Sequence, residues 1–378
     1  MRYFSLFSGI GGFELGINKA YVEITNRNAV RQGEGNQKEN ASKRKRLESK
    51  KGKGINPKNG QPVELSDWSD DPRAPHCVGY SEIDKHAIGI YEKYFKHTNY
   101  GDIRKIKPRN LPDFDLLIGG FPCQSFSIAG KRKGFEDTRG TLFFEIARIV
   151  AAKRPRLLLL ENVKGLLSHE KGRTFGIILR TLDGLGYDLQ WQVLNSKNFG
   201  VPQNRERVFI VGHLRGTPRP EVFPLAQNAS EDIILPTITT RVTADSNGTY
   251  VGKRPAHKNL KYIGAVMSEK NKKWLDDGKQ LSRNFPQGSR IYDAKGIATT
   301  LASQAGGLGA KTGLYAVKGL QKIRRLTPKE CERLQGFPDD WTLGASDTQR
   351  YKCLGNAVTV NVVQAIVKKL VFARVKSK

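Results

Sequence analysis

A cysteine and a glutamate stand out as residues that could together do nucleophilic and acid–base chemistry. Cys123 lies just after Pro122, and four basic residues follow over 131–139; positive charge stabilises the thiolate, the nucleophilic form of cysteine. Glu161 directly follows four consecutive leucines, where a carboxylate is costly to bury without a partner. Arginines in the segment 203–207 could orient it. A small buried cysteine and a buried ion pair are the structural alternatives, and both stay open from these residues alone.

The elements that must position these residues form an alternation of apolar runs and helical periodicity, which predicts an α/β fold with a doubly wound, mostly parallel sheet. Ligands of such sheets bind beyond the carboxyl ends of the strands. The glycine turn after Phe7, Glu82, Cys123 and Glu161 each follow a predicted strand, so we expect them to converge. We predict strands over 2–7, 77–80, 114–118, 156–160, 189–194 and 208–212, and helices from 13 and over 85–95, 141–152, 174–185 and 358–371.

Charge narrows the class of partner. The 378 residues carry 64 Lys and Arg against 36 Asp and Glu, a formal net charge of +28, which favours a polyanion. No apolar run approaches the roughly 18 residues of a membrane span, and the first residues lack a signal-peptide core, so we expect a cytoplasmic protein without a membrane partner. The four cysteines are widely spaced and contain no C-x-x-C pair, which predicts neither a zinc site nor a disulfide scaffold.

Composition divides the chain into four parts. We expect a catalytic and cofactor-binding domain over 1–212, a smaller, irregular, β-rich domain over 213–325, a hinge region over 326–349, and a C-terminal helix over 350–378 that returns to the first domain. A basic insertion at about 25–75 interrupts the first domain. Its stretch from 38 to 58 holds nine basic and two acidic residues. It is either a solvated linker or an arm that contacts phosphates.

A glycine turn after the first strand predicts an adenosine-containing ligand. The segment 7–12 reads Phe-Ser-Gly-Ile-Gly-Gly, an incomplete dinucleotide pattern, and Glu82 ends the next strand, where it could accept two ribose hydroxyls. We expect Glu14, at the start of the first helix, to face a bound ligand. A carboxylate there disfavours a pyrophosphate and favours a zwitterion such as S-adenosylmethionine.

Six blocks in this order resemble those of the DNA (cytosine-5)-methyltransferases, in particular the compact bacterial restriction–modification type. The blocks are 7–12, 120–124, 134–140, 161–163, 203–207 and 355–358. The resemblance covers most of residues 1–23 and 78–378 and leaves the basic insertion unexplained. It implies a sequence-specific DNA cytosine-5 methyltransferase that flips its target base out of the duplex. It also implies a Rossmann-like catalytic domain and a target-recognition domain.

The resemblance assigns a role to each candidate catalytic residue. Cys123 adds to C6 of cytosine, and Glu161 bonds N3. Arg205 stabilises the exocyclic oxygen of the base, and Arg207 steadies Glu161 or its loop, whereas Asn162 structures the loop. S-adenosyl-L-methionine supplies the methyl group for C5 and leaves as S-adenosyl-L-homocysteine, and no metal is needed.

The resemblance also implies binding residues and partners. The cofactor contacts it implies are Phe7, Gly9, Gly11, Glu82 at the ribose, Ile83 at the adenine face, Asp102 at the adenine amino group, Pro122, Leu142 and Asn356. The DNA contacts it implies are Ser127 on a lid over 124–140, Gln287, Arg290 and Thr300. The partners are double-stranded DNA and a cognate restriction endonuclease acting on the same site, and the chain is expected to be a monomer.

Two other functions stay open beside this one. A tRNA cytosine-5 methyltransferase would share the catalytic residues, but the long segment between 212 and 326 favours DNA. A catalytically silent DNA-binding protein would have no use for a thiol opposite a carboxylate, so the intact set of Cys123, Glu161 and Arg205 argues against it.

Overall fold

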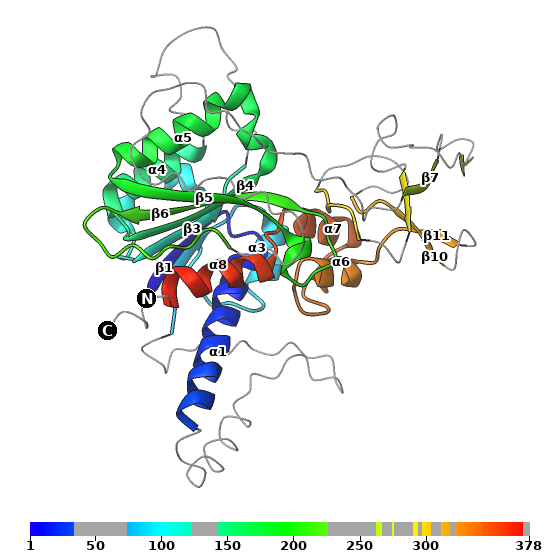
Figure 1. The fold of residues 1–378 in the computed structure, drawn as a ribbon, viewed down its shortest axis with the longest axis horizontal. Helices are drawn as coiled ribbons and strands as arrows, with labels where there is room; N and C mark the ends of the chain where they lie inside the picture. The colour runs from blue at the N-terminus through cyan, green and yellow to red at the C-terminus, as the bar shows by residue number, and fades with distance from the viewer. Residues whose placement is uncertain are drawn as a thin grey trace.

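A six-stranded sheet forms the centre of the computed structural model, which describes residues 1–33, 74–122, 142–225, 262–266, 274–275, 290–293, 297–303, 311–317 and 322–372. The strand order is β2-β1-β3-β4-β6-β5 (Figure 1). Strand β6 is antiparallel to both of its neighbours, and the other pairs are parallel, which confirms the predicted mostly parallel sheet. The strands are β1 Arg2–Leu6, β2 His76–Ser81, β3 Leu116–Gly120, β4 Leu157–Val163, β5 Tyr187–Asn195 and β6 Glu206–Leu214.

Helices cover both faces of this sheet (Figure 1). The four leucines of β4 show why: Leu158 and Leu160 join the core under α4 and α5, whereas Leu157 and Leu159 join the core under α1 and α8. Successive side chains of a strand point to opposite faces, so a continuous apolar run fits a strand that is buried on both sides. The helices are α1 Gly12–Gly33, α3 Lys85–Tyr91, α4 Leu142–Lys153, α5 Arg173–Gly184, α6 Pro328–Leu334, α7 Asp347–Asn356 and α8 Val360–Phe372. Short 3₁₀ helices are η2 Ile103–Lys105, η3 Pro108–Asn110, η6 Lys164–Leu167, η7 His169–Gly172 and η8 Ser196–Phe199.

A second sheet of short strands lies beyond α6 and α7 (Figure 1). Its order is β11-β10-β9-β7-β8, which fits the predicted smaller β-rich part. Its strands are β7 Tyr262–Val266, β8 Trp274–Leu275, β9 Arg290–Asp293, β10 Leu314–Val317 and β11 Lys322–Arg324.

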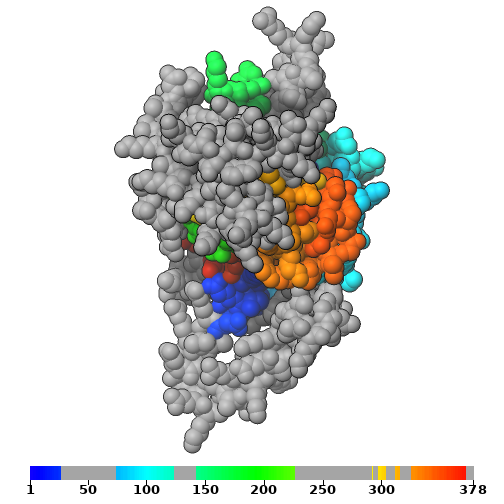
Figure 2. All heavy atoms as spheres, turned by 90° about the vertical axis from the view of Figure 1, so that its right-hand side faces the viewer, coloured from blue at the N-terminus to red at the C-terminus, as the bar shows by residue number. Residues whose placement is uncertain are grey.

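A third cluster of buried residues joins α3, α6 and α7 behind the glycine turn. The Trp341 ring stacks on Tyr94 with centroids 3.6 Å apart, and its indole N–H donates to the Ile10 carbonyl at 2.9 Å. The chain after the second sheet therefore supports the turn that follows β1. Figure 2 shows the region of α6 and α7 in orange, next to residues of the N-terminal segment in blue.

The structure corrects several predicted boundaries. Helix α1 continues to Gly33, past the expected start of the insertion at 25, because no glycine or proline lies between 17 and 32. Residues 34–73 lie outside the described ranges. The part predicted as a C-terminal helix over 350–378 also contains the end of α7, because Ala357 is extended and the β-branched run 358–360 follows it; the helix predicted over 358–371 is α8. The helix predicted over 85–95 ends at Tyr91.

Other local predictions hold. Thr327 and Glu330 form a capping box at the start of α6, so the expected hinge region contains a regular helix. Within the described ranges, no helix is long and apolar enough to cross a membrane. The four-part division into domains stays a prediction.

Candidate active site

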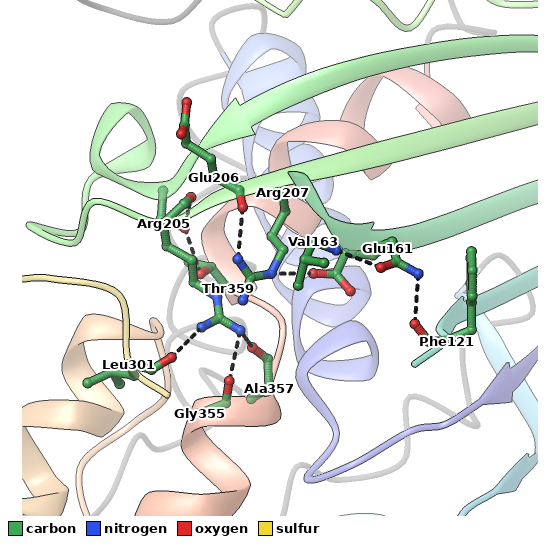
Figure 3. A network of polar contacts seen from close by, with 12 residues as sticks. Phe121, Glu161, Val163, Arg205, Glu206, Arg207, Leu301, Gly355, Ala357 and Thr359 are labelled. Carbon is green, nitrogen blue, oxygen red and sulfur yellow. Dashed lines mark hydrogen bonds and ion pairs between the residues drawn. The ribbon is translucent and has the colours of Figure 1, made fainter. Parts of the chain in front are cut away.

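Glu161 lies at the carboxyl end of β4, opposite an arginine of the neighbouring strand. The Arg207 Nε is 3.0 Å from Glu161 Oε1, and the two side chains are only 15% and 12% exposed (Figure 3). The antiparallel register of β4 and β6 sets this pair, since Val163 is opposite Arg207. On the other side, β3 pairs Gly120 with Glu161, and a Cβ added to Gly120 would lie 3.0 Å from Glu161 Oε2. A glycine therefore leaves room for the carboxyl group.

Burial raises the pKa of Glu161, and the Arg207 guanidinium opposes that rise. The carboxyl group can therefore hold a proton closer to neutral pH than an exposed glutamate does. A carboxylic acid in this place can donate a hydrogen bond, and its carboxylate can return to the arginine. This is the behaviour of a general acid.

Asn162 joins the ends of β3 and β4. Its Nδ2 donates to the Phe121 carbonyl at 2.9 Å, and its Oδ1 accepts from the Val163 N–H at 2.8 Å. Asn162 is therefore a loop-structuring residue, as predicted. The chain passes from Phe121 to the exposed Pro122, and Cys123 lies just outside the described residues.

Arg205 does not take the position that the sequence suggested. Its side chain is 1% exposed, and its guanidinium donates to the carbonyls of Leu301 at 3.1 Å, Gly355 at 3.0 Å and Ala357 at 2.8 Å (Figure 3). Both Nη groups are thus committed to backbone acceptors. The arginine that contacts Glu161 is Arg207, in line with the role predicted for it, whereas the three carbonyl bonds of Arg205 do not favour its predicted contact with the base.

The glycine turn and the end of β2 form the second half of the site. Glu82 Oε2 accepts from the Gly9 N–H at 2.9 Å, and its Oε1 accepts from the N–H groups of Ile83 and Asp84 at 2.8 Å. Parallel pairing of β1 with β2 brings these two strand ends together. Gly9 and Gly11 have φ values of +55° and +84°, which favour glycine.

These residues fit an adenosine group. A Cβ added to Gly9 would meet nothing within 4 Å, so space is open beside the turn. The Ile83 side chain is 67% exposed, which is unusual for an isoleucine and suits a flat apolar partner. The carboxylate of Glu82 can accept hydroxyl groups, and it is held by three backbone donors.

Other predicted cofactor residues lie around this edge. Asp102 caps η2 and pairs with Arg104 at 2.6 Å, and the Ser81 hydroxyl ties the preceding Gly101 to the end of β2. Asn356 is exposed at the end of α7. Helix α7 is joined to the segment after Glu82 by the ion pair of Lys352 with Asp84 at 2.7 Å.

The remaining two cofactor candidates are partly buried. Phe7 packs against the core beside α4, and Leu142 is the first residue of that helix.

Glu14 points away from this edge, contrary to expectation. It is fully buried in the first turn of α1, where its Oε1 accepts from the Tyr91 hydroxyl at 3.2 Å, and burial raises its pKa to about 7. It cannot face a phosphate, so the argument that Glu14 disfavours a pyrophosphate is wrong. The helix packs on α3 with this side, which the sequence alone did not indicate.

Two of the four predicted DNA contacts, Ser127 and Gln287, lie outside the described residues. Arg290 begins β9, and Thr300 donates its hydroxyl to the Asn204 carbonyl. A residue without a predicted role is Gln203, whose amide accepts from the Leu301 N–H at 3.2 Å and donates to the Leu334 carbonyl at 2.9 Å. Its place in the block 203–207 was the only available signal. Among the described residues, no cluster of three or more His, Cys, Asp or Glu could hold a metal ion.

A doubly wound sheet with a glycine turn after its first strand and a carboxyl group at the end of two other strands is the architecture of a nucleotide-binding α/β enzyme. The family model for C-5 cytosine-specific DNA methylases matches residues 73–371. The chain belongs to this family, which confirms the resemblance seen in the sequence; it is a DNA (cytosine-5-)-methyltransferase. The family uses S-adenosyl-L-methionine, and DNA is its substrate.

Individual relatives agree with this assignment. The type II methyltransferase M.HhaI of Haemophilus parahaemolyticus is 39% identical over 295 residues, which cover 77% of this chain and 86% of the relative. M1.ScrFI of Lactococcus lactis subsp. cremoris is 40% identical over 311 residues, 79% of this chain and 72% of the relative. Among solved structures, the Dnmt2 methyltransferase of S. pombe has a TM-score of 0.59 at 19% identity and covers 99% of both chains, which shows the same fold.

Proposed function

We propose that this chain methylates C5 of a cytosine flipped out of a specific duplex sequence, with Cys123 as the nucleophile, Glu161 as the acid at N3 and Arg207 as the residue that holds Glu161. The observation that carries the proposal is the Glu161–Arg207 pair, 3.0 Å apart and nearly buried at the end of β4. It gives a carboxyl group with a raised pKa directly beside the strand end that leads to Cys123.

The chemistry needs a nucleophile because cytosine C5 is a weak carbon nucleophile by itself. The Cys123 thiolate forms a bond to C6, and the electron pair of the C5–C6 double bond moves into the ring. Glu161 donates a proton or a strong hydrogen bond to N3, so that the ring does not hold an isolated negative charge. Arg207 then stabilises the carboxylate that Glu161 becomes.

When bound, S-adenosyl-L-methionine supplies the electrophilic methyl group for C5. Glu82, Ile83, Asp102 and Asn356 would hold its adenosine part against the glycine turn. After methylation, water takes the proton from C5, the C5–C6 double bond re-forms, and the Cys123 thiolate leaves C6. The carboxylate of Glu161 recovers its proton, and the chain is unchanged.

The partners follow from the same reading. Double-stranded DNA is the substrate, and the net charge of +28 favours its binding over that of a neutral partner. The relatives named type II methyltransferases support pairing with a restriction endonuclease that acts on the same site. We expect the chain to act as a monomer.

Substitution of Cys123 by serine tests the nucleophile. Wild type and Cys123→Ser are expressed in a bacterium without DNA methylation, and bisulfite sequencing then reports which cytosines are modified. We expect a recurring modified sequence with wild type and none with the variant, because a serine hydroxyl is a far weaker nucleophile than a thiolate. Binding of the purified variant to the modified sequence should stay within about threefold of wild type, since the serine keeps the shape of the side chain.

A matched control separates chemistry from folding. Cys331→Ala removes a buried free thiol of α6 and should keep the modification pattern. Substantial methylation by Cys123→Ser would contradict its role. Methylation of tRNA and not of duplex DNA by wild type would contradict the proposed substrate.

A further inference from the structure

Arg205 is the centre of a buried joint between three parts of the chain (Figure 3). The residue precedes β6 of the main sheet. Its Nη1 donates to Leu301, in the segment 297–303 that lies between β9 and β10 in the chain, and its Nη2 donates to Gly355 and Ala357, at the end of α7. One guanidinium therefore ties the catalytic sheet, the β-rich part and the C-terminal helices together.

The segment 297–303 is held closely against this joint. The Asn204 N–H donates to the Ala298 carbonyl at 2.8 Å, and the Gln203 amide bonds the Leu301 N–H. A Cβ added to Gly355 would lie 2.5 Å from backbone atoms of Ala302 and Ser303, so α7 touches that segment backbone to backbone. Glycine is required at 355 for this contact.

Asn356 is the last residue of α7, and it lies between Gly355 and Ala357, the two residues whose carbonyls accept from the Arg205 Nη2. Gly355 and Ala357 are buried, whereas Asn356 is exposed toward the solvent edge of α7. The Arg205 Nη2 donates to both flanking carbonyls, at 3.0 Å and 2.8 Å. The bond to Gly355 fixes the peptide plane that precedes Asn356, and the bond to Ala357 fixes the plane one residue further on. Between them, the Ala357 N–H donates to the Cys353 carbonyl at 3.0 Å, so the backbone on both sides of Asn356 is held, and with it the direction of the Asn356 side chain.

We infer that Arg205 is a positioning residue, which fixes the cofactor-side Asn356 relative to the segment 297–303 and does not contact the base. The inference rests on the proposed function in one respect, the assignment of Asn356 to the cofactor. The two arginines of the block 203–207 then have different roles: Arg205 orients Asn356, and Arg207 orients Glu161.

Binding of S-adenosyl-L-homocysteine to the full chain, measured by calorimetry without DNA, tests the inference. Lysine keeps the charge of Arg205, but its single ammonium group lacks the planar fork that reaches three carbonyls. We expect Arg205→Lys to raise the Kd for S-adenosyl-L-homocysteine, and the KM for S-adenosyl-L-methionine, about tenfold, with kcat at saturating cofactor changed less than about threefold. A variant that is merely less stable would lower kcat through a smaller active fraction and leave Kd unchanged.

A double-mutant cycle with Asn356→Ala makes the test specific. If Arg205 acts through Asn356, Arg205→Lys should add little to the weakening that Asn356→Ala already causes. Gly355→Ala, which pushes against the segment 297–303, should weaken binding in the same direction and serves if Arg205→Lys does not fold. Arg215→Lys is the control, because Arg215 follows the last residue of β6, at the end away from the joint, and pairs with Asp188 in an exposed position.

The outcomes separate the two proposals. An unchanged Kd for Arg205→Lys with a large fall in kcat would overturn the inference and favour a contact between Arg205 and the cytosine. Fully additive effects in the double-mutant cycle would also overturn it. A wild-type chain that binds S-adenosyl-L-homocysteine but does not methylate duplex DNA would refute the proposed function, while the binding cycle would still decide the role of Arg205.

Discussion

Two carboxyl groups, one at the end of a strand and one in the first turn of a helix, behave differently, although burial raises the pKa of both. Glu161, at the end of β4, keeps 12% of its side chain exposed and has the Arg207 guanidinium at 3.0 Å. Glu14, behind the glycine turn, is fully buried, and its neighbours are the hydroxyl groups of Ser5 and Tyr91. The first has an opening and a cation, and the second has neither.

The difference teaches what separates a reactive carboxyl from a structural one. Burial alone raises the pKa of both groups, so a raised pKa by itself does not mark a catalytic residue. A fixed cation allows Glu161 to exist in either protonation state, and its partial exposure lets a base reach it. Glu14 is sealed among neutral groups, so its protonated form is the one that suits its surroundings.

Removing the acid from Glu161 should give the largest effect. Glutamine keeps the shape of the side chain, but it cannot supply a proton to N3 or take up the resulting charge. We expect Glu161→Gln to lower kcat about a thousandfold, about 4 kcal/mol, with DNA binding retained. Transfer of a labelled methyl group to duplex DNA measures the rate. Activity within fivefold of wild type would show that Glu161 is no more catalytic than Glu14.

The same substitution at Glu14 should change stability and spare activity. The pKa of Glu14 is about 7 in the folded chain against an ordinary value of 4.5, so folding takes up a proton between these pH values. Its contribution to stability is therefore complete below pH 4.5 and is lost as the pH rises through 7. As the pH rises from 5 to 8, we expect the free energy of unfolding of wild type to fall by about 2 to 3 kcal/mol more than that of Glu14→Gln.

Chemical denaturation of both proteins at the two pH values checks this expectation. The difference between the two proteins removes the titration of every other group to first order. Equal pH dependence of wild type and variant would mean that Glu14 is ionised in the folded chain across this range.

The sequence was sufficient for the strand ends because the signal there is local. The four leucines before Glu161 predict a strand buried on both faces, and Glu82 follows the weaker strand pattern over 77–80. Parallel strands present their carboxyl ends at one edge of a sheet, so the convergence of the glycine turn, Glu82 and Glu161 followed without any long-range information. The six ordered blocks then identified the family.

The sequence was insufficient where long-range packing decides a direction. Arg205 and Arg207 are two residues apart in one block, and only the pairing of β6 with β4 and the arrival of Leu301 and Gly355 separate their roles. The inward direction of Glu14 depends on α3, which is more than seventy residues away. In both places a contact between distant segments decides what a charged side chain faces.

Substitution of Arg207 by lysine gives the smallest of these effects and sharpens the comparison most directly. Lysine keeps a positive charge, but it has no planar fork to hold the carboxylate at 3.0 Å. Glu161 then lacks a fixed cation beside its carboxyl group, as Glu14 does. We expect kcat to fall about tenfold, about 1.4 kcal/mol.

Since the guanidinium lowers the pKa of Glu161, its loss should raise that pKa further. A protonated Glu161 drives the reaction, so the decline of kcat at high pH should begin at a higher pH in Arg207→Lys than in wild type. A pH profile of single-turnover methylation measures the shift, and a decline that begins at a lower pH would contradict the role of Arg207 as the cation that sets the protonation of Glu161.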